Sequence, residues 1–113
     1  MPDKHPTVLS LTTTVASAED AQRLARALLG QRLAACVQVE AGLVSHYRWQ
    51  GSVHEDAEWR LTLKTLPEAL PDLLGFMDAQ HPYDTPQLLW QELESSADYA
   101  QWVRSQVSLP PTL

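Results

Sequence analysis

The chain has 113 residues, a length that suits a single domain with a modest core. Hydrophobic residues make up 44% of it, which is too many for a disordered chain, and the net charge of −6 argues against nucleic acid or an anionic membrane as a partner. No apolar run approaches the roughly 20 residues of a membrane span, the first residues lack the pattern of a signal peptide, and the one cysteine, Cys36, agrees with a reducing compartment. We therefore expect a single cytoplasmic domain over residues 1–113, with an ordered core at about residues 7–107 and a short disordered tail at each end.

The first predicted elements are a strand and a helix. Residues 7–14 favour a strand, because valine and leucine lie among threonines and one serine. Ser17 can cap the first turn of a helix that Gly30 ends. One face of this helix carries an apolar stripe, made of Ala21, Leu24, Ala25, Leu28 and Leu29.

A long hairpin is predicted next. Gly51 and Ser52 suit a two-residue turn, because glycine supplies the positive φ that the first turn position needs. In that register Gln50 opposes Val53. The two strands are residues 35–39, continued by 43–50, and residues 53–65.

The apolar pattern predicts an irregularity in this hairpin near Ala41 and Gly42. An unbroken register would put Val39 on the face opposite to Leu61 and Leu63. One extra residue would instead pair Val39 with Leu63 and return these side chains to a common face. We therefore expect a β-bulge there, with the glycine adopting the unusual backbone angle.

A second helix is predicted between residues 67 and 80. Thr65 and Glu68 have the spacing of a capping box, but Pro71 would break a helix that began at Thr65. The start of the regular helix therefore stays open. Its buried stripe is predicted to be Leu70, Leu73, Leu74 and Met77.

A fourth strand and a third helix complete the chain. The strand is predicted over residues 87–93, and Ser95 or Ser96 caps the helix that follows. The apolar face of this helix is predicted to be Tyr99, Trp102, Val103 and Val107.

The order of elements predicts an α+β fold of the ferredoxin-like βαββαβ type, with a long hairpin and an extra carboxyl-terminal helix. The hairpin strands are longer than most strands in a domain of this size. Near the tip they carry Tyr47, Trp49 and Trp59, which one small core cannot easily cover. A projecting arm with exposed aromatic side chains indicates a partner surface, most simply another copy of the chain.

Three segments together are similar to the CutA family. They are Gln31-Arg32-Leu33-Ala34-Ala35-Cys36-Val37, Tyr47-Arg48-Trp49-Gln50-Gly51 and His81-Pro82-Tyr83-Asp84-Thr85-Pro86. The resemblance spans about residues 7 to 107. It implies a homotrimer in which long hairpins wrap neighbouring subunits, with a shape like that of PII signalling proteins. It also implies a role in divalent cation and copper tolerance, and possible binding of a divalent metal such as Cu.

Two positions depart from the family pattern. Some relatives carry a cysteine near the end of the first strand, where this chain has Thr12, Thr13 and Thr14. A glutamate usually follows the proline after the histidine motif, where this chain has Gln87. Both changes remove candidate metal ligands, because hydroxyls bind soft metals such as Cu(I) poorly and an amide carries no charge.

His81 is the candidate metal ligand, because a neutral imidazole suits Cu(II), Zn and Ni. The alternative is a histidine that caps the carboxyl end of the second helix. His46 and His54 lie near the hairpin tip, but they do not face each other in the predicted register, so a two-histidine site within one hairpin is not expected.

A second set of residues is predicted to line a cleft between subunits and to bind a small ligand there. Lys64 would meet an anion in this cleft, and the carboxylates of Asp56 and Glu58, on the same face of the third strand, would meet a cation. The alternative is a solvated or subunit-buried polar face held by ion pairs such as Arg48 with Glu55. The set consists of Lys64, Tyr47, Trp49 and Tyr83.

Two ligand-binding functions remain open at this point, beside a third possibility, a structural trimer with no ligand. One is a trimeric metal-associated protein of CutA type, with His81 in its polar cleft. The other is a PII-like sensor that binds a small anion or a partner protein between subunits, with Lys64 as the key residue. No nucleophile and base can be paired from the sequence, so an enzyme is not expected.

Overall fold

The computed structural model describes residues 4–109, so residues 1–3 and 110–113 of the two predicted tails lie outside the described part of the chain. Within residues 4–109 no helix is both long and apolar enough to cross a membrane. The described elements are β1 (Thr7–Val15), α1 (Ala18–Gly30), β2 (Cys36–Trp49), β3 (Ser52–Thr65), a 3-10 turn (Pro67–Ala69), α2 (Leu70–Gln80), β4 (Leu89–Glu94) and α3 (Ala97–Gln106).

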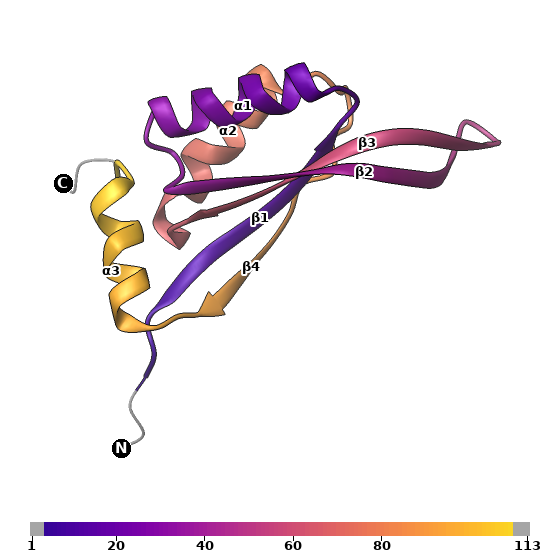
Figure 1. Ribbon diagram of the computed structural model, residues 1–113. Coiled ribbons are helices and arrows are strands. Elements are labelled where there is room, and N and C mark those ends of the chain that lie inside the picture. Colours follow the sequence, from indigo (N-terminus) through magenta and orange to yellow (C-terminus); the bar gives the residue numbers. More distant parts are fainter. Residues whose placement is uncertain (1–3, 110–113) are drawn as a thin grey trace.

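The four strands form one antiparallel sheet in the order β2-β3-β1-β4. Helices α1 and α2 cover one face of this sheet, and α3 lies at the end remote from the hairpin tip (Figure 1). The β2-β3 hairpin projects well beyond the helices (Figure 1). The predicted α+β fold with a long hairpin and an added third helix is confirmed.

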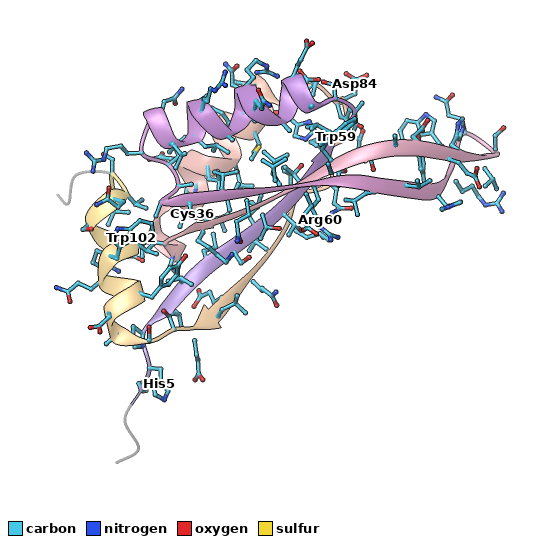
Figure 2. All side chains as sticks on the ribbon, viewed as in Figure 1. His5, Cys36, Trp59, Arg60, Asp84 and Trp102 are labelled. Carbon is cyan, nitrogen blue, oxygen red and sulfur yellow. The ribbon has the colours of Figure 1, made fainter. Side chains whose placement is uncertain are left out.

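Alternation along β3 separates the core from the other face of the sheet. Leu61 and Leu63 are fully buried and pack with α1 and α2 in the main core. Trp59 is on the same face of β3 as these two leucines. Arg60, the next residue along the strand, points to the opposite face (Figure 2). The face away from the two helices therefore carries Asp56, Glu58, Arg60 and Lys64, whereas Glu55 shares the face of Trp59.

Trp59 was predicted to lie exposed near the hairpin tip, and that placement is wrong. Its side chain is partly buried and packs against the main core, because it pairs with the buried Val15 of β1. Tyr47 and Trp49 do lie on the projecting part and are 43% and 50% exposed. The hairpin thus keeps two of its three large aromatic side chains uncovered within one chain.

The hairpin turn is shifted by one residue from its predicted place. Trp49 pairs with Ser52, so Gln50 and Gly51 form the turn, with φ angles of 50° and 81°. Two positive φ angles are typical of a type I′ turn, which follows the twist of the flanking strands. The predicted pairing of Gln50 with Val53 is therefore wrong.

The predicted irregularity in β2 is confirmed. The register shifts between Glu40 and Leu43, and Gly42 has a φ of 81°. Val39 shares a face with Leu61 and Leu63, as expected, but its direct partner is Leu61 and not Leu63.

The second and third helices differ from expectation at specific residues. The predicted capping box is wrong, because neither the 3-10 turn nor α2 has a side-chain cap, and α2 begins at Leu70 with Pro71 in its first turn. Ser96 caps α3 by accepting from the backbone N–H of Tyr99. The predicted apolar face of α3 is half right: Val103 and Val107 are buried with Ala100, while Tyr99 and Trp102 are 38% and 45% exposed.

Candidate functional site

An open groove lies at the base of the projecting hairpin. Its volume is about 650 Å³. One wall is the hairpin, and the other is the loop that joins α2 to β4, which we call the groove loop. We call the groove itself the hairpin groove, and its lining includes Ser45, His46, Tyr47, Trp49, Glu58, Tyr83 and Asp84.

The two walls are joined by a hydrogen bond between Tyr83 and Glu58. The Tyr83 hydroxyl donates to Glu58 Oε2 at 2.7 Å. Burial first, and then this bond to the carboxylate, raises the pKa of Tyr83 far above its usual range. The hydroxyl therefore stays protonated, and one oxygen of Glu58 is held by the loop.

A second tyrosine is fixed in the same way on the hairpin itself. The Tyr47 hydroxyl donates to Asp56 Oδ2, and the bond raises the pKa of Tyr47. The Tyr47 ring also stacks on His54, with centroids 5.4 Å apart and planes 18° apart. The pairing of Ser45 with Asp56 places the tyrosine and the carboxylate on one face of the hairpin.

The charge on the lining is negative. Glu58 and Asp84 line the groove, whereas none of the lysine or arginine side chains in residues 4–109 does so. Such a lining attracts cations and repels anions.

His81 lies beside the groove, and both of its ring nitrogens are engaged. Nδ1 accepts a hydrogen bond from the backbone N–H of Tyr83 at 3.1 Å, and Nε2 is 2.9 Å from Thr13 Oγ1. Because Nδ1 accepts, the neutral ring carries its proton on Nε2 and donates it to Thr13. A metal ion at either nitrogen would have to replace one of these bonds. The metal role of His81 stays a prediction.

Lys64 does not join the other predicted ligand-binding residues within one chain. Its Nζ donates to Gln38 Oε1 at 3.3 Å, and it pairs with Cys36 across the sheet. Six residues of extended strand, about 20 Å, separate it from Glu58. Tyr47, Trp49 and Tyr83, in contrast, meet in the hairpin groove.

The remaining candidate ligands are scattered. His46 Nδ1 lies 3.0 Å from Glu55 Oε1. The ion pair that was predicted as an alternative, Arg48 with Glu55, is therefore replaced by a contact between His46 and Glu55. His46 and His54 do not oppose each other, as expected. Among residues 4–109 there is no group of three or more histidine, cysteine, aspartate or glutamate side chains placed to hold a metal.

The comparisons with known proteins agree with this fold and motif pattern. A model of the family described as CutA1 divalent ion tolerance protein matches residues 9–106. The chain belongs to the CutA1 family. It is similar to the divalent-cation tolerance protein CutA of Thermus thermophilus, with 45% identity over 80% of this chain and 89% of that protein. It also resembles a chloroplastic CutA protein of Arabidopsis thaliana, with 32% identity over 93% of this chain and 59% of that longer protein.

Solved CutA structures share the whole architecture. A CutA structure from Synechococcus elongatus has a TM-score of 0.87 and 36% identity, covering 94% of this chain and 95% of that one. The Thermus thermophilus structure has a TM-score of 0.85 and 40% identity, covering 89% and 99%. The names of the family and of these relatives are not enzyme names.

The two departures from the CutA pattern can now be placed. Thr13 is fully buried and serves as the partner of His81, which is a structural use of its hydroxyl. Gln87 lies in the lining of the hairpin groove, where it presents an uncharged amide. Two carboxylates reach the groove. Glu58 was predicted, with Asp56, from the alternation along the third strand, whereas Asp84 was not singled out as a site residue.

Proposed function

We propose that this chain is a divalent-cation tolerance protein that acts in the cytoplasm as a homotrimer and binds a divalent cation in the hairpin groove. The observation that carries the proposal is the carboxylate of Glu58, which faces the groove while Tyr83 holds one of its oxygens. The description of the CutA1 family, which names divalent ion tolerance, supports a cation as the ligand.

Self-association is supported by the two uncovered edges of the sheet. Strands β2 and β4 are the edge strands, and each leaves one row of backbone groups without a strand partner in the chain. Large apolar side chains on the hairpin and on β4 are also exposed. Those outside the hairpin groove are Val39, Val44, Val53, Leu89, Trp90 and Leu93. A second copy of the chain would cover both features, and the number of three comes from the CutA resemblance.

The cation site is proposed to need this assembly. Within residues 4–109 of one chain no three-residue metal cluster forms, so further ligands would come from a neighbouring copy. Oxygen ligands such as Glu58 and the groove hydroxyls favour Mg, Ca and Mn. Copper(II), the metal that the CutA resemblance suggests, would favour His81 as a ligand. Binding there would break one of the two hydrogen bonds that the His81 ring makes.

Calorimetric titration of the full chain with Mn(II), Cu(II) and Zn(II) tests the site. We expect Glu58→Gln to weaken Mn(II) binding at least tenfold, since it removes the charge but keeps the shape of the side chain. Asp78→Asn is the control, because Asp78 is an exposed carboxylate on α2 and does not line the groove. Equal binding by wild type and Glu58→Gln would refute the site, and a loss confined to a His81→Gln variant would move it to His81.

Native mass spectrometry at micromolar concentration tests the assembly. We expect a mass of three chains. A stable single copy would contradict the proposal, because the groove would then lack the neighbouring copy that is proposed to complete it.

A further inference from the structure

We propose that the hairpin groove accepts an organic ammonium ion, with the rings of Tyr47, Trp49 and Tyr83 around the cation and the Glu58 carboxylate as its counter-charge. This inference rests on the proposed function in that both place a cation in the same groove. It adds the chemical class of a larger ligand than a metal ion.

The three rings supply the surface that such a cation needs. Tyr47, Trp49 and Tyr83 all line the groove. The face of an aromatic ring is negative, and it attracts an ammonium group within about 6 Å of the ring centre. Trp49 provides the strongest of these faces, and its side chain is half exposed in one chain.

Two of the rings are held in place before any ligand arrives. The Tyr83 hydroxyl donates to Glu58, and the ring lies against His81 with centroids 5.3 Å apart. Tyr47 donates to Asp56 and stacks on His54. A ligand therefore does not have to order these two side chains, which lowers the entropic cost of binding.

Charge and size favour an organic cation over other small molecules. Glu58 and Asp84 line the groove, and among residues 4–109 no lysine or arginine side chain shares the lining, which disfavours an anion. The volume of about 650 Å³ lies within the range of roughly 300–1,000 Å³ that small-molecule sites occupy. A bare metal ion would leave most of this space, and all three ring faces, unused.

Titration of the full chain with choline, compared with its neutral carbon analogue 3,3-dimethylbutan-1-ol, tests the inference. The two molecules have nearly the same shape and differ in the positive charge. We expect choline to bind at least tenfold more tightly than the alcohol. Equal affinities, or no saturable binding of choline, would overturn the inference.

Variants locate the site. We expect Trp49→Leu to weaken choline binding about tenfold, since it removes one cation–π face. Tyr47→Leu serves as the second variant in case Trp49→Leu does not assemble. Trp102→Leu is the matched control, because Trp102 is similarly exposed but lies on α3, far from the projecting end of the hairpin (Figure 2). Unchanged choline binding in both groove variants would contradict the inference.

The same variants separate this inference from the divalent-cation proposal. Trp49→Leu should leave Mn(II) affinity within twofold of wild type, whereas Glu58→Gln should weaken both ligands. Mn(II) binding without choline binding would refute the organic cation alone. Choline binding without Mn(II) binding would refute the metal function and leave the organic cation standing.

Discussion

The Nε2 atom of His81 lies 2.9 Å from the hydroxyl of Thr13, a residue 68 positions earlier in the chain. This bond links the start of the groove loop to the carboxyl-terminal part of β1, where Thr13 is fully buried. On the other side of the ring, Nδ1 receives the backbone N–H of Tyr83. His81 thereby sets the position of the tyrosine that forms one wall of the hairpin groove.

Replacing Thr13 with valine should destabilise the protein. Valine has nearly the same shape but cannot accept the His81 proton, so a partly buried donor loses its partner, at a cost of about 1–3 kcal/mol in the free energy of unfolding. Urea denaturation measures the change. Thr12→Val is the control, because Thr12 is partly exposed on the opposite face of β1 and should change stability by less than about 0.5 kcal/mol. Equal effects of the two substitutions would argue against the bond.

Acid should weaken the fold through His81. Burial, the main cause, lowers the pKa of His81 below its usual value of about 6.5. The unfolded chain therefore binds a proton more readily than the folded chain, so the stabilising contribution is complete above about pH 6.5 and is lost as the pH falls through the folded pKa. We expect the free energy of unfolding of wild type to fall faster below pH 6.5 than that of His81→Gln. Parallel pH profiles would show that the ring does not titrate in this way.

Asparagine at position 50 should stabilise the hairpin. Gln50 adopts a φ of 50° in the turn, a conformation that asparagine tolerates better than glutamine, and an asparagine–glycine pair is preferred in type I′ turns. The gain expected is about 0.5 kcal/mol in the free energy of unfolding. Gln50→Val should lose stability, and a loss with asparagine would contradict the assigned turn.

Two glycine-to-alanine substitutions should act in opposite directions. Gly42 has a φ of 81° in the bulge, so Gly42→Ala should cost about 1–2 kcal/mol through backbone strain although its Cβ would meet open space. Gly75 lies inside α2 with nothing within 4 Å of a built Cβ, and Gly75→Ala should gain about 1 kcal/mol through helix propensity. Thermal unfolding of both variants checks this, and a stabilising Gly42→Ala would rule out strain at the bulge.

The faces of the hairpin could be predicted from the sequence, but the cross-strand partners could not. Shifting the turn from Gly51-Ser52 to Gln50-Gly51 moves each pairing by two residues, and this keeps every side chain on its predicted face. The apolar pattern is therefore satisfied equally well by both registers. The choice between them depends on the backbone geometry of the turn, and Gln50 gives no sign that it accepts a positive φ.

The groove could be predicted only in part, for a related reason. Tyr47 and Trp49 lie on the same arm, so their proximity follows from the hairpin itself. The bond of Tyr83 to Glu58 joins residues 25 positions apart and depends on how the groove loop crosses the hairpin, which no local pattern encodes. Lys64 was grouped with these residues because its side chain lies on the same face of β3 as that of Glu58. The alternation of side chains predicts this shared face, but it does not say how far apart two residues lie along a 14-residue strand.

An anomalous difference map from crystals of the full chain grown with Mn(II) tests the central claim most directly. The account predicts a trimer with one peak per hairpin groove, within coordination distance of Glu58 and of a side chain from a neighbouring copy. A peak at His81 with its bonds to Thr13 or Tyr83 broken, or a manganese-loaded crystal with no peak in the groove, would contradict it.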